Sequence, residues 1–392
     1  MDRIKEIISE LDDSIFKTPL SVDEDFLYYE DLKEKYEEIL NNFARIEDKN
    51  FFQELKSIKE NVLDAIQNYY SGELEQACKC IENIVMAFEK NELIVDDVNS
   101  HFIFKWIIAE QGIHKGNNGE HIDLYKARIA EGIDSFDAED MIHIPFKKRG
   151  LVPTQRFSIA GVPCMYLATS TYCCWKELGM PPDNNFNVSH VTLEKLRLFN
   201  LAVNLRFLKA AIIKNVDFSE CSITLNEFLK DYFKLWMLNF ACSYTVKEKG
   251  RAFKSEYIVP QLVMLALKKN NIDGVVHCSR KIEETVSNLW ANPKNLNVAI
   301  IGKYEKEKGD DIFLKDYISI TNSVNYNEFK QLNLKGMSPK YNKNLDWLPN
   351  QINLIQLAGD TYSYSNTDFY YFEAYIKFLA QKKMKGETEC QN

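Results

Sequence analysis

Glycine and proline are almost absent between Ser21 and Gly112, where Gly72 is the one interior exception. These two residues are the commonest breakers of helices. Apolar residues recur in this segment at helical spacing, in three runs: Leu32, Tyr36, Leu40 and Phe43; Phe52, Leu55, Ile58, Val62, Ile66 and Tyr69; and Ile81, Ile84, Val85 and Phe88. The segment therefore predicts an antiparallel helical bundle, with a break near Gly72 and a further helix over 101–111.

The pattern changes after the polar stretch KGNNGE at 115–120, which is typical of a linker. Beyond it, short apolar runs predict strands at 124–129, 164–168, 188–193, 196–199, 272–279, 297–303 and 312–320. Amphipathic runs predict helices at 171–178, 224–241, 257–269 and 368–383. Strands and helices mix without regular βαβ spacing, so the predicted class is α+β. We expect a helical bundle at 1–115, a mixed domain at 116–310 and a C-terminal extension at 311–392 that packs on the body.

The composition excludes several classes of protein. The 392 residues are 45% hydrophobic and 27% charged, as in globular proteins. A net charge of −9 argues against an obligatory nucleic-acid partner. No apolar run approaches the ~18 residues of a membrane span, and the charged start, MDRIKEIISELDD, does not resemble a signal peptide. Nine cysteines without a CxxC pair favour a reducing cytoplasm and predict no bound metal.

The bundle carries no recognisable catalytic pattern. P-loop, GxGxxG, HExxH, GxSxG and EF-hand motifs are absent from the whole sequence. A HEPN-type nuclease would need an arginine and a histidine about one helical turn apart. His101 and His114 lack such an arginine, and Arg45 lacks such a histidine. We therefore interpret the bundle as non-catalytic, with binding of a partner or formation of a homo-oligomer as its expected role.

Residues suited to chemistry gather between Arg149 and Glu177. Arg156 lies in a polar lead-in, and Tyr166 lies in the apolar strand that follows the turn at 160–163. Thr169 or Ser170 can cap the next helix, on which Glu177 is about two turns in. These three side chains are expected to converge on one wall of a pocket.

The same stretch resembles the RES domain, a family named for its Arg, Glu and Ser. The similarity lies in the pattern RFSxxGVPxxYLATS with Glu177 eleven residues after Tyr166. LYKAR at 124–128 is similar to the family's opening strand, and EYIVPQ at 256–261, IDGV at 272–275 and Ser279 are similar to its closing half. The resemblance covers about 122–303, and the helical N-terminal region is similar to one that precedes some RES domains. Gln155, Ser158 and the pair His277-Cys278 depart from the family's usual residues.

The resemblance implies an ADP-ribosyltransferase-like fold that cleaves the nicotinamide–ribose bond of NAD. Family members degrade NAD, some by phosphorolysis, as toxins of bacterial toxin–antitoxin pairs. It implies that Glu177 stabilises the oxocarbenium-like ribose, and that Arg156 and Arg128 bind the pyrophosphate. Tyr166 would stack on the substrate or donate a hydrogen bond. Ser279 would bind phosphate or a ribose hydroxyl, and Gln261 would assist in binding NAD. NAD is then a substrate, phosphate a candidate co-substrate, and an antitoxin or regulatory protein a candidate partner.

Two other functions stay open at this level. ADP-ribose could be passed to a protein or nucleic acid instead of phosphate or water. Alternatively, the departures at Gln155 and Ser158 could mark an inactive pocket that senses a nucleotide or binds a partner. By residue type alone, Glu177 is a solvated helix residue, Tyr166 a core residue and Ser279 a strand-end cap. The arginines could pair with acids such as Glu131 or Asp134, and His277 is more simply a buried, satisfied histidine than a base.

Overall fold

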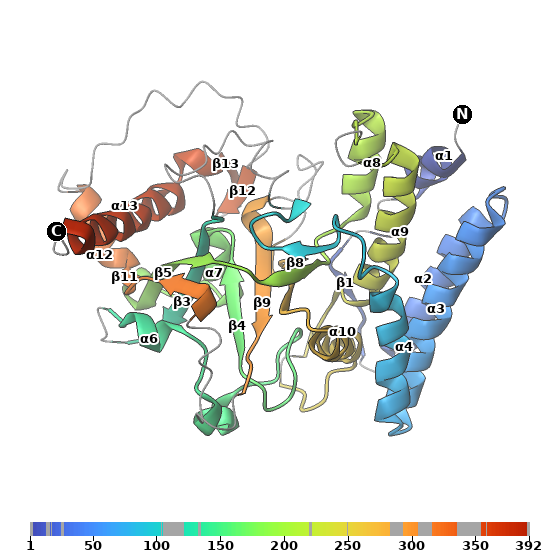
Figure 1. The fold of residues 1–392 in the computed structure, drawn as a ribbon, viewed down its shortest axis with the longest axis horizontal. Coiled ribbons are helices and arrows are strands. Elements are labelled where there is room, and N and C mark those ends of the chain that lie inside the picture. The colour runs from blue at the N-terminus through green and yellow to red at the C-terminus, as the bar shows by residue number, and fades with distance from the viewer. Residues whose placement is uncertain are drawn as a thin grey trace. The chain divides into compact units, whose positions relative to one another are not determined.

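The structure is a computed structural model, and it describes residues 3–12, 16, 18–24, 27–102, 104, 121–131, 135–218, 222–248, 250–282, 293–304, 316–334, 354–357 and 359–389. The chain forms two compact units. Unit 1 consists of 1–96, 153–160 and 197–291, and unit 2 consists of 97–152, 161–196 and 292–392. Each unit thus joins segments that are far apart in the sequence (Figure 1).

Unit 1 is mainly helical. Its helices are α1 (Arg3–Glu10), α2 (Leu27–Phe43), α3 (Lys49–Tyr70), α4 (Leu74–Met86), α8 (Leu205–Ile213), α9 (Leu225–Ala241) and α10 (Ile258–Lys269), with the 3₁₀ turn η4 (Ser255–Tyr257) before α10. Helices α2 to α4 confirm the predicted helical N-terminal region, and Gly72, at a φ of +81°, follows the end of α3. Strands β8 (Gly274–Cys278), β6 (Arg197–Asn200) and β2 (Val95–Asp97) are neighbours in that order, and β1 (Leu20–Ser21) pairs in parallel with β7 (Tyr244–Thr245).

Helix α9 is the centre of unit 1. Thr224 and Glu227 form a capping box at its start, as the sequence predicts for Thr224. Every residue from Leu235 to Ala241 is fully buried, so the C-terminal half of α9 has packing neighbours on all sides. Helix α2 supplies part of that cover, because the Tyr28 hydroxyl donates to the Ala241 carbonyl at 3.0 Å and the Tyr36 hydroxyl donates to the Met237 carbonyl at 2.8 Å.

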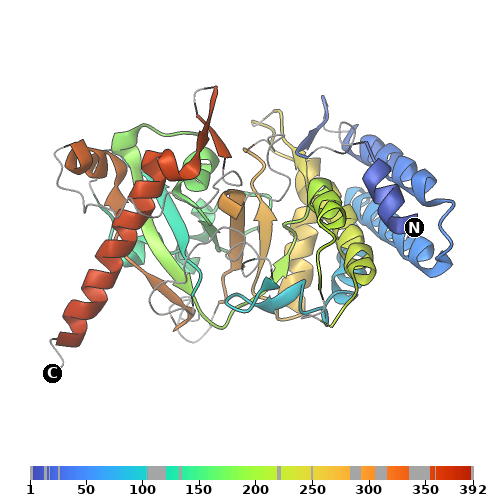
Figure 2. The ribbon, with the colours of Figure 1, turned by 90° about the horizontal axis from the view of Figure 1, so that it is seen from above.

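Unit 2 contains a sheet with helices against it. Its strands run in the order β10 (Ile318–Ile320), β5 (Phe186–Leu193), β3 (Leu124–Ile129), β4 (Cys164–Ala168) and β9 (Leu296–Ile301), with antiparallel neighbours, and β11 (Val324–Asn325) also pairs with β5. The helices are α6 (Ala138–Met141), α7 (Thr171–Glu177), α12 (Tyr326–Leu334) and α13 (Asp368–Glu389). The hairpin β12 (Leu354–Leu357) and β13 (Asp360–Ser363) precedes α13, which Figure 2 shows as a long straight helix. Short 3₁₀ turns are η1 (Phe146–Leu151), η2 (Asp183–Asn185), η5 (Pro293–Asn295) and η7 (Tyr364–Asn366).

The predicted α+β class is confirmed, and so are most of the elements expected beyond the linker. Strands β3 and β4 have the predicted bounds, while β5, β6, β8, β9, α7, α9, α10 and α13 differ only at their ends. Helices α8 and α12 and the β12–β13 hairpin were not predicted. The linker at 115–120, most of the helix expected at 101–111 and the first four residues of the strand expected at 312–320 lie outside the described residues, and β10 forms the end of that strand.

Two expected absences can be compared with the described residues alone. Within those ranges, no helix has both the length and the apolar character needed to span a membrane. The same ranges hold no group of three or more His, Cys, Asp or Glu side chains arranged to bind a metal ion.

Candidate active site

The predicted site residues divide between the two units. Glu177, Tyr166 and Arg128 belong to unit 2, and Arg156, Gln261 and Ser279 belong to unit 1. Each group is therefore described within its own unit.

The connection from β4 to α7 sets the position of Glu177. Ser170 is the N-cap of α7, and its hydroxyl accepts a hydrogen bond from the Cys173 amide at 3.0 Å. Glu177 is the last residue of this short helix, which Gly179 and Met180 follow with positive φ angles of 81° and 61°. The sequence thus predicts both ends of α7 correctly to within one residue, and Glu177 lies at its C-terminal end with a half-buried side chain.

Asn297 orients the Glu177 carboxylate. Its side-chain amide donates from Nδ2 to Glu177 Oε1 at 2.7 Å, and its Oδ1 accepts from the Cys173 thiol at 3.3 Å. The two partners fix which way the amide faces, because a carboxylate accepts and a thiol donates. Asn297 is buried and pairs with Ala168 across β9 and β4. The carboxylate is therefore attached to the sheet by a charge-assisted hydrogen bond.

Tyr166 lies on β4 between the buried residues Met165 and Leu167, and its own side chain is only half-buried. This alternation is typical of a strand with one covered face, so Tyr166 is not a simple core residue. The Tyr166 carbonyl accepts a hydrogen bond from Lys126 Nζ on β3 at 3.2 Å. Burial, with the nearby Arg128 charge as a second cause, lowers the pKa of Lys126 to about 8.

Arg128, on β3, donates from Nη2 to the Ile142 carbonyl at 2.7 Å. Burial lowers the pKa of its guanidinium from the ordinary value. Glu131, one of the two acids that could have paired with the arginines, is exposed and forms no ion pair with Arg128 or Arg156, and Asp134 lies outside the described residues. Arg128 thus has one nitrogen engaged by the backbone and a half-buried side chain.

In unit 1, Arg156 lies in a turn that is closed by side-chain hydrogen bonds. The Gln155 amide donates to the Ser158 hydroxyl at 3.1 Å, and that hydroxyl donates to the Gln155 carbonyl at 2.8 Å. Gln261 on α10 donates from Nε2 to the same carbonyl at 3.0 Å. Gln155 and Ser158, which depart from the family pattern, therefore build the turn, and Gln261 supports its backbone.

Two arginines meet the C-terminal end of α9. Arg156 donates from Nη1 to the Cys242 carbonyl at 2.9 Å and lies 5.2 Å from the ring centre of Tyr257. Arg280, which sequence reasoning missed, donates to Asn239 Oδ1 at 2.7 Å, one turn before Cys242. Within the described ranges neither guanidinium forms an ion pair with a carboxylate. Burial and the neighbouring Arg280 charge lower the pKa of Arg156. Two partly buried cations with no carboxylate partner among the described residues suit an anionic ligand.

Ser279 and His277 lie just before Arg280 in the sequence. The Ser279 side chain is buried, and its hydroxyl accepts from the Lys281 amide at 3.2 Å. The His277 ring is buried 4.3 Å from the ring of Phe157, and its Nδ1 lies 3.0 Å from the Cys278 carbonyl. Burial lowers the pKa of His277 to about 3, so the ring is neutral at pH 7. The ring is buried as expected, but its Nε2 has no hydrogen-bond partner among the described residues, so the expectation of a satisfied histidine is met only in part.

Part of the chain is similar in sequence to a protein that is named as a putative toxin. No family model matches it. "Putative toxin YopC" of Bacillus subtilis (strain 168) is 32% identical over 202 residues, which are 50% of this chain and 44% of that protein. The match thus covers less than half of that relative's length. The crystal structure of the M. tuberculosis MbcT–MbcA toxin–antitoxin complex overlaps 55% of this chain and 90% of the compared chain, at 10% identity and a TM-score of 0.26. A TM-score this low supports no structural inference.

Proposed function

We propose that this chain is an enzyme that cleaves the nicotinamide–ribose bond of NAD and acts as a bacterial toxin or defence effector. The observation that carries the proposal is the Asn297–Glu177 hydrogen bond, because it fixes the orientation of a half-buried carboxylate at the end of a short helix. The RES-like pattern around Arg156, Tyr166 and Glu177 supports the proposal, as does the 32% identity to a protein named as a toxin.

Cleavage of the nicotinamide–ribose bond requires little from the protein beyond electrostatic stabilisation and positioning of the substrate. Nicotinamide leaves as a neutral molecule and takes the bonding electrons of the C–N bond, so positive charge develops on the ribose. A carboxylate beside that ribose stabilises the oxocarbenium-like transition state and can also hold ribose hydroxyls. Glu177 has this role in the proposal. Phosphate or water then attacks the ribose from the opposite face.

The other residues bind substrate in the proposal. Arg156 suits a pyrophosphate oxygen because its guanidinium has no carboxylate partner within the described ranges, and Arg280 adds a second positive charge. Tyr166 offers a half-buried ring and hydroxyl from β4, and Arg128 and Ser279 are further candidates for contact with substrate. Gln261 acts through the turn that carries Arg156.

Incubation of the purified protein with NAD tests the proposal. We expect nicotinamide release, with ADP-ribose formed in buffer lacking phosphate and a phosphorylated ADP-ribose formed if phosphate is the preferred acceptor. NAD labelled in the adenylate half tests whether a protein or nucleic acid is the acceptor, because transfer of ADP-ribose would leave the label on that macromolecule. Unchanged NAD in all three assays, from protein with a cooperative thermal unfolding transition, would refute cleavage. A melting-temperature shift with NAD in that case would favour the nucleotide-sensing alternative.

The toxin role adds an expectation about partners and cells. A NAD-degrading enzyme in the cytoplasm needs a neutralising protein, so we propose an antitoxin as partner. The helical N-terminal region is a candidate surface for that partner or for a second copy of this chain. Induced expression should lower cellular NAD before growth stops.

Substitution of Asn297 tests how the carboxylate is oriented. Asn297→Leu removes the donor to Glu177, and we expect kcat to fall about tenfold because the carboxylate loses its fixed direction. Asn297→Asp puts a second carboxyl group against Glu177 and removes the donor to it, so kcat should fall and should depend more strongly on pH than in the wild type. Steady-state kinetics between pH 5 and 9 would measure both effects. Wild-type profiles for both variants would remove Asn297 from the mechanism.

A further inference from the structure

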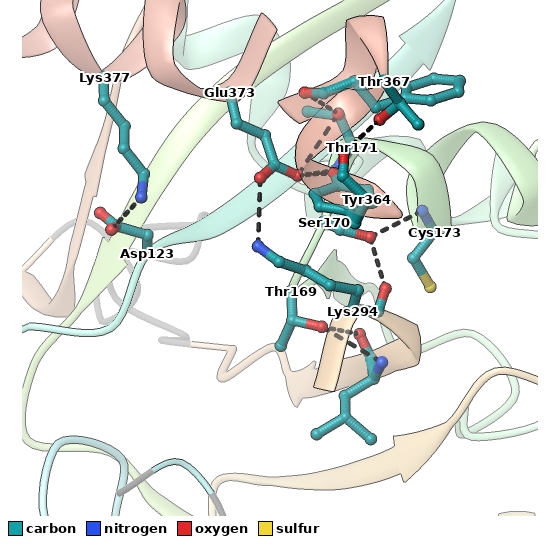
Figure 3. A network of polar contacts seen from close by, with 12 residues as sticks. Asp123, Thr169, Ser170, Thr171, Cys173, Lys294, Tyr364, Thr367, Glu373 and Lys377 are labelled. Carbon is teal, nitrogen blue, oxygen red and sulfur yellow. Dashed lines mark hydrogen bonds and ion pairs between the residues drawn. The ribbon is translucent and has the colours of Figure 1, made fainter. Parts of the chain in front are cut away.

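A buried glutamate of the C-terminal helix binds the start of α7. Glu373 on α13 is 4% exposed, and its Oε1 accepts a hydrogen bond from the Thr171 amide at 2.8 Å. The same oxygen accepts from the Tyr364 hydroxyl, and Oε2 forms an ion pair with Lys294 Nζ at 3.2 Å. Figure 3 shows the Glu373 carboxylate pointing between Thr171, Tyr364 and Lys294. The contact joins positions 202 residues apart in the chain.

These contacts supply acceptors for two amides in the first turn of α7. The first amides of a helix have no partner within it, and here Glu373 accepts from Thr171 while the Ser170 hydroxyl accepts from Cys173. The carboxylate also lies at the positive end of the helix dipole. A helix of seven residues is too short to be stable by itself, so the tertiary contact from Glu373 adds to the local Ser170 cap in holding its first turn.

Glu373 also reaches the segment that carries Asn297. Lys294 lies in η5, three residues before Asn297, and its carbonyl accepts from the Ser170 hydroxyl at 2.5 Å. The Glu373 carboxylate therefore contacts Thr171, six residues before Glu177, and Lys294, three residues before Asn297. Those two residues form the hydrogen bond on which the proposed function depends.

We propose that Glu373 is a positioning residue for the Glu177–Asn297 pair, through its contacts with α7 and Lys294. The inference rests on the proposed function. Glu373 touches neither Glu177 nor a substrate in this proposal; it acts by fixing the two segments that carry the pair. Loss of its carboxylate should therefore slow turnover without weakening the binding of NAD.

The test compares Glu373→Ala and Glu373→Gln with the matched control Lys377→Met. Lys377 lies one turn later on α13 and pairs with Asp123 at 2.5 Å, so its loss weakens the docking of the same helix without touching α7. For Glu373→Ala we expect kcat about tenfold lower with KM within twofold. Hydrogen exchange at the amides of 171–174 should become about tenfold faster, since the first turn of α7 loses an acceptor. Glu373→Gln keeps an acceptor for Thr171 and should recover part of both quantities, and Lys377→Met should leave both within twofold.

Each outcome decides the inference. Equal losses in Glu373→Ala and Lys377→Met, a raised KM with unchanged kcat, or unchanged exchange at 171–174 would overturn it. If Glu373→Ala does not fold, Glu373→Gln and Lys294→Met provide the same comparison. Hydrogen exchange does not depend on turnover. A wild-type protein inactive on NAD would therefore refute the proposed function, while the exchange data would still show whether Glu373 fixes the start of α7.

Discussion

Replacement of Glu177 by Gln should lower kcat for NAD cleavage by about a hundredfold to a thousandfold, while KM changes only a few-fold. The amide has the same shape and can still accept from Asn297 Nδ2, which lies 2.7 Å from Glu177 Oε1 in the wild type. It cannot neutralise the positive charge that develops on the ribose. The loss should therefore appear in the transition state and hardly at all in the ground state. The loss would be measured as the rate of nicotinamide release in single-turnover reactions, with nicotinamide quantified by chromatography.

The matched control is Glu131→Gln, which changes an exposed glutamate in the same unit. It should retain full activity, because an exposed charge contributes little to a distant reaction. Thermal unfolding of both variants should match the wild type within a few degrees. A Glu177→Gln protein that cleaves NAD at more than about a tenth of the wild-type rate would exclude this carboxylate as the principal stabiliser of the transition state.

Replacement of Arg156 by Lys should lower kcat/KM for NAD by about tenfold to a hundredfold, mainly through KM. Lysine keeps the charge, but its three donors lie on one nitrogen, so it cannot form the planar two-pronged contact of a guanidinium with a pyrophosphate while it binds the Cys242 carbonyl. The guanidinium does have spare donors, since its Nη1 alone is used by Cys242. Nicotinamide mononucleotide, which lacks the pyrophosphate bridge, should show a smaller difference between wild type and variant than NAD does.

Arg197→Lys is the control for this prediction, because Arg197 is an exposed arginine on β6 of the same unit. Its kinetics should equal those of the wild type. An Arg156→Lys enzyme with unchanged KM for NAD would show that Arg156 serves only to bind the end of α9.

Local signals in the sequence were enough to predict the elements that carry the site. A brief apolar run bounded by turn residues gave β4, and a serine before the next run gave the cap of α7. The capping residue Thr224 likewise marked the start of α9. These features depend on residues within one or two turns of each other, so a single sequence contains them.

Contacts between distant segments could not be predicted in the same way. Asn297 stands at the start of an apolar strand, where a buried polar residue is a weak hint of function, but its partner is 120 positions away. Nothing near Glu373 or Arg280 in the sequence indicates their partners. Helix α8 was missed because its run is short and apolar, although Asn204 accepts from the Phe207 amide at 2.7 Å and is a valid cap signal. The domain boundaries near 115 and 310 and the convergence of Glu177 with Arg156 stay predictions.

The burial of the C-terminal half of α9 has a practical consequence for anyone who wishes to shorten this protein. The ring centres of Phe43 and Phe233 lie 4.7 Å apart, and those of Phe16 and Trp236 lie 5.9 Å apart, so aromatic rings from the first fifty residues cover α9. A cut at 115–120 would expose the aromatic rings of α9 to water, and exposed apolar patches of this kind promote aggregation. We therefore expect the rest of the chain to aggregate when it is expressed without the N-terminal helices.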